Sequence, residues 1–122
     1  MAKTILIVED EPNIAEALAF LFEREGYDVR LASDGETGLA AARSDRPAAI
    51  VLDVMLPQRN GFELLKALRG DPSVGRTPVM VLTARGQKRD RETAGAVGAD
   101  VYLTKPFSNR LVVDEMRRLV AP

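Results

Sequence analysis

The chain is 122 residues long, which at about 150 residues per domain predicts one domain spanning residues 1–122. It contains no cysteine and no histidine, which excludes disulfides, thiolate or Ser–His–Asp catalysis, and zinc sites built from Cys or His. Its net charge of −1 gives no bias toward nucleic acid or membranes, so neither is expected as a direct partner. With no secretory signal or transmembrane stretch in the sequence, the cytoplasm is the expected compartment.

The first half of the chain alternates strand and helix patterns. Ile5–Val8 is a continuously apolar run, as in a strand that is covered on both faces. Apolar residues at helical spacing then predict a helix that begins at Pro12 and stops at Gly26. Three elements follow in order: a half-exposed edge strand at Tyr27–Leu31, a weaker helix after Asp34, and a second buried strand at Ala48–Leu52.

The second half continues this alternation. Asn60 followed by Glu63 resembles a capping box that opens a third helix. The remaining elements are a buried strand at Val79–Leu82, a helix from about Gln87 to Val97 ended by Gly98, a strand at Val101–Leu103, and a helix after Ser108 with Leu111, Val112, Met116 and Leu119 on one side. Strand and helix alternate five times, which predicts an α/β fold with one doubly wound, five-stranded parallel sheet and helices on both faces.

Polar side chains follow the predicted strands at their carboxyl ends. Glu9 and Asp10 come after the first strand, Asp53 after the third, Thr83 at the end of the fourth, and Lys105 after the fifth. Because ligands of open parallel sheets bind at this edge, we expect these side chains to converge on one site. The alternative is that each has an ordinary role: the acids as caps of turns and helices, the threonine as a strand end, and the lysine as a solvated turn residue.

Carboxylates held close together repel one another unless a cation lies between them. Mg²⁺ is bound by one or two carboxylates and leaves coordination positions for phosphate oxygens. An acidic pocket with a nearby lysine therefore suits phosphoryl transfer. Asp53, which directly follows a buried strand, is the candidate nucleophile, because carboxylates can form aspartyl-phosphate intermediates.

Five motifs extend this interpretation over essentially the whole chain. They are Ile7-Val8-Glu9-Asp10-Glu11, Leu52-Asp53-Val54-Met55-Leu56-Pro57 with Gly61 downstream, Leu82-Thr83-Ala84, Gly98-Ala99-Asp100, and Tyr102-Leu103-Thr104-Lys105-Pro106-Phe107. In this order and spacing they resemble the response-regulator receiver domains of two-component signalling. The resemblance implies the flavodoxin-like strand order 2-1-3-4-5.

The resemblance also implies a role for each site residue. Asp53 would accept a phosphoryl group from a phosphohistidine. Mg²⁺ would be held by Asp10, Asp53 and the backbone carbonyl of Met55, with Glu9 acting directly or through water. Lys105 would pair with the phosphoryl group, and the peptide bond between Lys105 and Pro106 would be cis. Thr83 would hydrogen-bond the attached phosphoryl group and move together with Tyr102, reshaping the face formed by the fourth helix, fifth strand and fifth helix.

Partners follow from the same resemblance. The phosphoryl donor would be a sensor histidine kinase or a phosphotransfer protein, and the output would be a downstream effector protein or an output domain missing from this chain. The protein would be a monomer or a phosphorylation-dependent dimer. It would be regulatory rather than an enzyme, promoting only its own phosphorylation and dephosphorylation.

Three other interpretations compete with this one. A haloacid-dehalogenase-like phosphatase also uses a strand-end aspartate with Mg²⁺, but it requires a second acid where this chain has Met55. A flavodoxin would bind a flavin phosphate after the first strand, where Glu9, Asp10 and Glu11 would repel it. A pseudo-receiver that only docks partners would not need the complete set of site residues found here.

Overall fold

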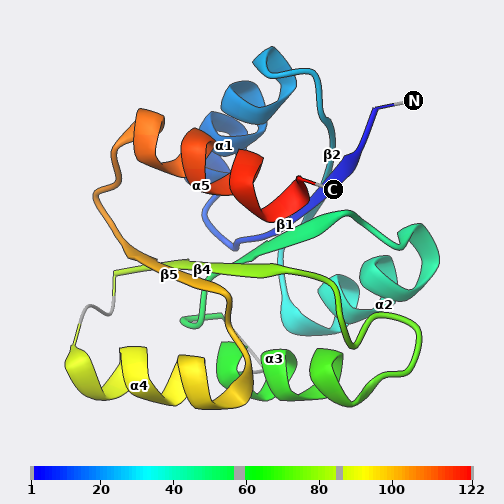
Figure 1. Ribbon diagram of the computed structural model, residues 1–122, viewed down its shortest axis with the longest axis vertical. Helices are drawn as coiled ribbons and strands as arrows, with labels where there is room; N and C mark the ends of the chain where they lie inside the picture. Colours follow the sequence, from blue (N-terminus) through cyan, green and yellow to red (C-terminus); the bar gives the residue numbers. More distant parts are fainter. Residues whose placement is uncertain (1, 57–59, 85–86, 122) are drawn as a thin grey trace.

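The structure is a computed structural model and describes residues 2–56, 60–84 and 87–121, so Pro57 of the Asp53 motif lies outside the described part. Strands and helices alternate along the chain (Figure 1). In order they are β1 (Thr4–Val8), α1 (Pro12–Arg24), β2 (Asp28–Ala32), α2 (Gly35–Asp45), β3 (Ala49–Leu52), α3 (Gly61–Gly70), β4 (Val79–Thr83), α4 (Lys88–Val97), β5 (Val101–Thr104) and α5 (Asn109–Val120). The predicted elements are confirmed, with ends that differ by one or two residues.

The five strands form one sheet in the order β2-β1-β3-β4-β5, and every neighbouring pair is parallel. Figure 1 shows α1 and α5 on one face of the sheet and α2, α3 and α4 on the other. This arrangement confirms the predicted doubly wound fold and its strand order. β2 lies at an edge of the sheet, in agreement with its alternating sequence.

Each face of the sheet carries its own hydrophobic core, because successive strand residues point to opposite faces. Under α1 and α5 the core includes Ile7, Val51 and Leu82, and Phe22 of α1 is fully buried in it. On the opposite face the core is built from the alternate strand residues together with apolar side chains of the other helices. The central strands β1, β3 and β4 are therefore apolar apart from Thr4 and Thr83 at their ends, as their sequences predict.

The helix starts show where the sequence patterns hold and where they do not. Asn60 caps α3, but its side-chain oxygen accepts a hydrogen bond from the N–H of Phe62 at 2.8 Å. The N–H of Glu63 bonds instead to the backbone carbonyl of Asn60, so the expected capping box is not formed. In α5, Ser108 is the cap, accepting from the N–H of Leu111 at 3.2 Å. Leu111 itself is 45% exposed, whereas Val112 and Met116, expected on the same side of this helix, are fully buried.

The first and last elements come together at the end of the sheet opposite the strand ends that carry the polar residues. The ammonium group of Lys3, just before β1, donates to the backbone carbonyl of Val120 at the end of α5. Among the described residues, the helices are all too short or too polar to cross a membrane.

Candidate functional site

Strand pairing brings the acidic residues side by side. Val8 of β1 and Leu52 of β3 are paired in register at the carboxyl ends of their strands. The backbone bonding continues past these ends, since the N–H of Asp53 donates to the carbonyl of Val8 at 3.1 Å and the N–H of Glu9 donates to that of Ala32 at 3.0 Å. The site residues are thus positioned by the sheet itself.

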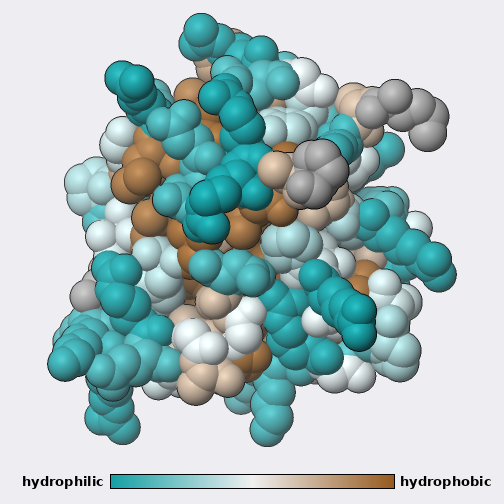
Figure 2. Space-filling model, in the orientation of Figure 1, coloured by the Kyte–Doolittle hydropathy of each residue, from teal (hydrophilic) through white to brown (hydrophobic). Residues whose placement is uncertain are grey.

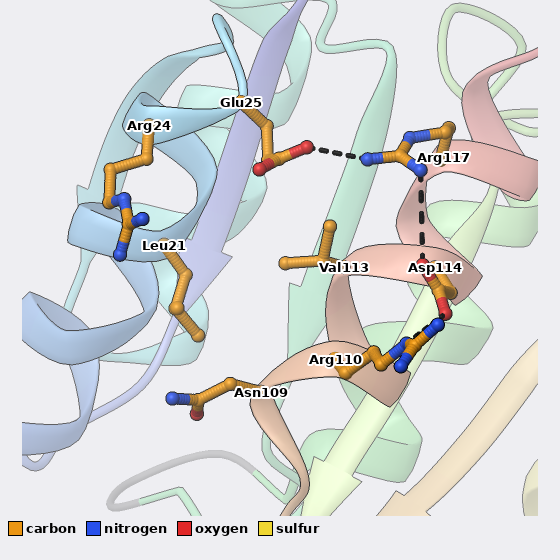
Figure 3. Close-up of a pocket in the computed structure, with 8 residues that line it drawn as sticks. All are labelled: Leu21, Arg24, Glu25, Asn109, Arg110, Val113, Asp114 and Arg117. Atoms are coloured by element: carbon orange, nitrogen blue, oxygen red, sulfur yellow. Dashed lines mark hydrogen bonds and ion pairs between the residues drawn. The ribbon is translucent and has the colours of Figure 1, made fainter.

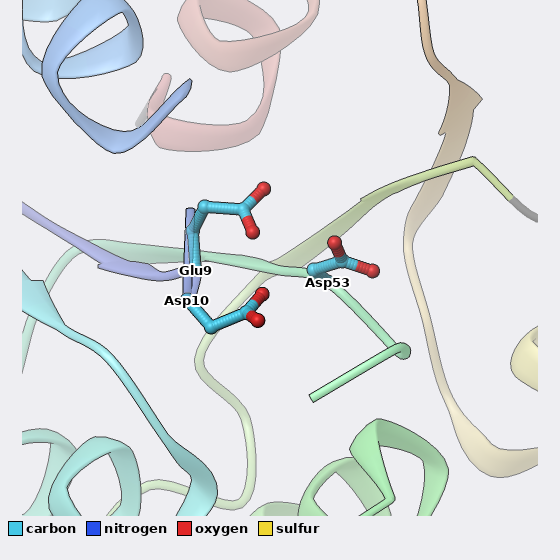
Figure 4. A group of neighbouring side chains, drawn as sticks. All are labelled: Glu9, Asp10 and Asp53. Atoms are coloured by element: carbon cyan, nitrogen blue, oxygen red, sulfur yellow. The ribbon is translucent and has the colours of Figure 1, made fainter. Parts of the chain in front are cut away.

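Three carboxylates converge at this edge of the sheet. Oxygen atoms from Glu9, Asp10 and Asp53 all lie within 4.8 Å of one another. Figure 4 shows the side chains of Glu9 and Asp10 reaching from one turn of the chain toward that of Asp53. Glu9 and Asp53 are 5% and 6% exposed, whereas Asp10 is exposed to solvent. The structure therefore brings together the acids that the sequence singled out.

Lys105 completes the cluster. It follows β5 at the same edge of the sheet as the three acids. The N–H of Lys105 donates to the carbonyl of Thr83 at 2.8 Å, which fixes its backbone beside β4. Its ammonium nitrogen donates to Glu9 Oε1 at 2.5 Å and to Asp53 Oδ2 at 2.8 Å. The peptide bond between Lys105 and Pro106 is cis, as expected.

Asp53 is held through both of its carboxylate oxygens. While Oδ2 accepts from Lys105, Oδ1 accepts from the backbone N–H of Met55 at 2.9 Å. Asp53 therefore caps the turn that follows β3, which is its expected ordinary role, and it also belongs to the charged cluster. The two contacts fix the orientation of the carboxylate toward the shared pocket.

Burial and pairing oppose each other in this cluster. Burial raises the pKa of Glu9, the hydrogen bond from Lys105 partly offsets that rise, and the charge of Asp53 adds to it. For Lys105, burial alone would lower the pKa, but the hydrogen bonds to Asp53 and Glu9 raise it above its usual value. The ammonium is therefore charged at neutral pH and supplies part of the positive charge that the carboxylates need.

A cavity of about 350 Å³ opens beside the cluster. Its lining residues are Asp10, Glu11, Ile14, Asp53, Met55, Ala84 and Lys105. Three carboxylates with close oxygen atoms are a donor set of the kind that Mg²⁺ accepts. The residues present thus fit a hard divalent cation, and the pocket next to them has room for a small anionic group.

Thr83 and Tyr102 lie on one face of the sheet. Val81 pairs with Tyr102, and Thr83 pairs with Thr104. Because parallel partners point to the same face, the side chains of Thr83 and Tyr102 are diagonal neighbours there. Thr83 is fully buried and Tyr102 is half-buried.

Two further residues shape the site without having been predicted to do so. The Arg91 guanidinium lies 5.0 Å from the centroid of the Tyr102 ring. The Gly61 backbone packs so closely on the Asp53 turn that a Cβ atom there would lie 2.3 Å from Val54 Cα. Of these two residues, only Gly61 could be recognised from the sequence, since this glycine belongs to the motif that follows Asp53. The Arg91 contact joins a helix to a neighbouring strand and leaves no local pattern.

A second hollow, of about 290 Å³, lies between α1 and α5 (Figure 3). Its apolar floor is formed by Leu21 and Val113, and Figure 2 shows apolar surface gathered among charged side chains over these two helices. Three of its charged residues are already paired, since Arg117 lies 2.6 Å from Glu25 and 3.9 Å from Asp114. This hollow contains none of the carboxylate cluster.

Comparison with known proteins identifies close similarities. The family model of the response regulator receiver domain matches residues 5–117. The alkaline phosphatase synthesis transcriptional regulatory protein PhoP of Bacillus subtilis is 46% identical over 112 residues, which are 92% of this chain and 46% of that protein. The chain spans about half the length of the curated relatives it matches.

Solved structures agree with this similarity. A putative response regulator from Chloroflexus aurantiacus superposes with a TM-score of 0.94 and 34% identity, covering 100% of both chains. The receiver domain of a sensor histidine kinase from Pseudomonas aeruginosa has a TM-score of 0.90 and 30% identity, covering 98% of both chains. That second structure has a magnesium ion coordinated in its active site cleft.

Proposed function

This chain belongs to the response regulator receiver domain family, a family of phosphorylation-dependent signalling switches, and we propose that Asp53 is its phosphoacceptor. One observation carries the proposal: the Asp53 carboxylate is buried, oriented at both oxygens, and placed within 4.8 Å of two other acids beside an open pocket. Capping of the turn explains the contact of Asp53 with the Met55 N–H, but not the convergence of three acids and a lysine at this one edge of the sheet.

The proposed reaction transfers a phosphoryl group from a phosphohistidine to Asp53. A carboxylate oxygen of Asp53 attacks phosphorus, so a P–O bond forms while the P–N bond to the imidazole breaks. The electron pair of the broken bond stays on the imidazole nitrogen, and the product is an aspartyl phosphate. Since the contacts from Met55 and Lys105 already orient the carboxylate, the chain contributes mainly positioning and charge.

We propose Mg²⁺ as the cofactor, held by Asp10, Asp53 and the backbone carbonyl of Met55, with Glu9 binding directly or through water. When bound, the ion would neutralise the charge on the phosphoryl oxygens. The close carboxylate oxygens support this assignment, and the magnesium in the Pseudomonas aeruginosa receiver domain gives it a precedent in the family.

The remaining site residues have proposed roles after transfer. Lys105 exchanges its contact with Asp53 for one with the phosphoryl group, which carries more negative charge. Thr83 hydrogen-bonds a phosphoryl oxygen, and Tyr102 moves with it, since the two side chains are neighbours on one sheet face. Phosphorylation would thereby alter the face formed by α4, β5 and α5.

We propose a histidine kinase or phosphotransfer protein in the cytoplasm as the donor, and an effector protein or an output domain as the recipient of the signal. The relatives are transcriptional regulators about twice as long as this chain, which favours an output function joined to or bound by the receiver. We also propose that the chain promotes only its own phosphorylation and dephosphorylation. Family membership favours this role over a phosphatase or a flavin carrier.

The proposal can be tested by intact-mass measurement after incubation with acetyl phosphate. We expect the wild-type chain to gain the mass of one phosphoryl group when Mg²⁺ is present, and to gain little in chelator. Asp53→Asn is expected to gain none, because an amide oxygen is a far poorer nucleophile than a carboxylate. Asp45→Asn, at the exposed end of α2, serves as the control and is expected to behave as wild type.

Two results would contradict the proposal. Equal mass gain by wild type and Asp53→Asn would remove Asp53 as the acceptor. Equal rates with Mg²⁺ and with chelator would remove the metal from the reaction.

A further inference from the structure

Helix α4 contributes few apolar side chains to the core, namely Ala94 and the partly buried Val97. Its ten residues bury only Asp90 and Ala94, and Ala94 is the smallest side chain that can contribute to a core. Figure 1 shows α4 on the face of the sheet that also carries α3, next to β5. Because hydrophobic stabilisation scales with buried apolar area, individual polar contacts between α4 and β5 matter more here than in a well-packed helix.

Arg91 of α4 makes two such contacts, and both are with Tyr102 of β5. Its Nη1 donates to the Tyr102 backbone carbonyl at 2.9 Å. Its guanidinium carbon lies 5.0 Å from the centroid of the Tyr102 ring, within the range of a cation–π interaction. One planar guanidinium therefore holds both the backbone and the ring of the same residue, which a lysine ammonium is poorly shaped to do.

The position of Tyr102 connects this contact to the site. Tyr102 and Thr83 are diagonal neighbours on one face of the sheet, and Thr83 ends the strand whose next neighbour is β3, which leads into Asp53. A ring held by Arg91 is thus one side chain away from the residue that would sense the phosphoryl group.

We propose that Arg91 is a positioning residue of the switch: it holds the Tyr102 ring against α4 in the resting protein, so that a movement of the ring breaks this contact and releases the helix. This inference rests on the proposed function, and it adds the residue that transmits the movement of Tyr102 to α4. In the resting protein the contact favours the Tyr102 position seen here. When the ring leaves this position, the cation–π contact is broken and α4 is held less firmly. The change at Tyr102 is thereby transmitted to the helix.

The test follows Tyr102 directly. The chain has two tyrosines and no tryptophan, so Tyr27→Phe leaves Tyr102 as the only strong emitter. Tyr27 packs edge-on against Phe22, a contact that phenylalanine preserves. In this background, acrylamide quenching of Tyr102 fluorescence is measured for wild-type Arg91, Arg91→Ala and Arg91→Lys, before and after acetyl phosphate with Mg²⁺. Hydrogen exchange of the α4 amides is measured on the same samples.

We expect Arg91→Ala to raise the quenching constant of the unphosphorylated protein about twofold and to speed exchange in α4, because the minor position of the ring becomes more populated. Phosphorylation should then change the quenching less than it does in wild type. Arg91→Lys keeps the charge but not the planar group, and is expected to resemble Arg91→Ala. Arg89→Ala removes an exposed arginine from the same helix and is expected to leave quenching unchanged.

The outcomes separate this inference from the proposed function. If no variant gains phosphoryl mass, the proposed function fails, and with it the assignment of Arg91 to a switch. If the protein gains the mass but Tyr102 quenching is the same in wild type and Arg91→Ala, the proposed function stands and the role of Arg91 is overturned. If Arg91→Ala only lowers the melting temperature, with quenching and its response to phosphorylation unchanged, Arg91 is merely structural and the inference is wrong.

Discussion

Lys105 and Asp53 meet across 52 positions of sequence, with the Lys105 ammonium nitrogen 2.8 Å from Asp53 Oδ2. The same nitrogen lies 2.5 Å from Glu9, so one cation bridges two buried carboxylates. Both acids are almost inaccessible to solvent, and neither could stay ionised there at low cost without a partner. Lys105 is thus a structural counter-ion as well as a candidate ligand for the phosphoryl group.

This pairing predicts a large loss of stability on removal of the lysine. Lys105→Ala leaves Glu9 and Asp53 buried without their counter-ion, and the free energy of unfolding at neutral pH should fall by about 3 kcal/mol. Chemical denaturation in chelator measures the change. Lys66→Ala, which removes an exposed lysine from α3, is expected to stay within about 0.5 kcal/mol of wild type. Equal small effects of both substitutions would mean that water screens the bridge.

The fold and the convergence of the site could be predicted from the sequence for a simple reason. Strands covered on both faces are apolar throughout, so a charge at their end stands out, and carboxyl ends of parallel strands meet at one edge. Asp53 after Ala49–Leu52 and Glu9 after Thr4–Val8 are both recognisable in this way.

The pairings within the site could not be predicted in the same way. Lys105 reaches Asp53 only once β5 is placed beside β4, and Arg91 reaches Tyr102 only once α4 is packed beside β5. Such contacts depend on side-chain directions after folding, for which the chain has no periodic signal. The exposure of Leu111 could not be predicted either. Its helical spacing matches that of its buried neighbours, but it lies beyond the edge of the covered face.

A second prediction separates two acids that the sequence treats alike. Repulsion among the three carboxylates leads to the expectation that neutralising either Asp10 or Asp53 stabilises the protein without metal. In the structure, Asp53 is bonded to Lys105 and to the N–H of Met55, whereas the Asp10 side chain has no hydrogen bond or ion pair among the described residues. We therefore expect Asp10→Asn to raise the melting temperature in chelator, and Asp53→Asn to lower it or leave it unchanged.

Adding Mg²⁺ completes this comparison. At 100 times the dissociation constant, the ion should stabilise wild type by about 2.7 kcal/mol, and both variants less, because each has lost a carboxylate ligand. Thermal melts at low salt, in chelator and then with Mg²⁺, measure both effects. Equal responses of all three proteins to Mg²⁺ would place the ion elsewhere.

Gly61 supports a third prediction. A Cβ atom at this position would lie 2.3 Å from Val54 Cα and 2.7 Å from the Asp53 carbonyl oxygen, so the start of α3 or the Asp53 turn has to move. Gly61→Ala is expected to lower the free energy of unfolding by about 2 kcal/mol and to weaken Mg²⁺ binding. Titration of Mg²⁺ followed by tyrosine fluorescence or calorimetry measures the second effect.

Gly95 is a matched control for this substitution. It lies inside α4, and a Cβ atom there would meet nothing within 4 Å. Gly95→Ala is therefore expected to stabilise the protein by up to about 1 kcal/mol, since alanine loses less backbone entropy in a helix. If Gly61→Ala bound Mg²⁺ as tightly as Gly95→Ala does, the close packing at α3 would have no part in positioning the site.

The last prediction concerns acid stability away from the site. The carboxylate of Asp71, at the end of α3, accepts hydrogen bonds from the Ser73 hydroxyl at 2.6 Å, the Ser73 N–H at 2.8 Å and the Arg43 guanidinium at 2.6 Å. These bonds, that of the Ser73 hydroxyl first, lower the pKa of Asp71 from 3.8 to about 2. A carboxyl group whose pKa is lowered by folding stabilises the fold above its unfolded pKa, and this contribution is lost as the pH falls toward the folded pKa. The difference in free energy of unfolding between wild type and Asp71→Asn should therefore be constant from about pH 7 to pH 5 and shrink between about pH 4 and pH 2.

Ser73→Ala removes the first of these bonds, so in that background the difference should shrink at a higher pH. Urea denaturation of wild type, Asp71→Asn, Ser73→Ala and the double variant across this pH range measures both effects. A difference that is unchanged down to pH 2 would mean that Asp71 does not titrate as its hydrogen bonds require.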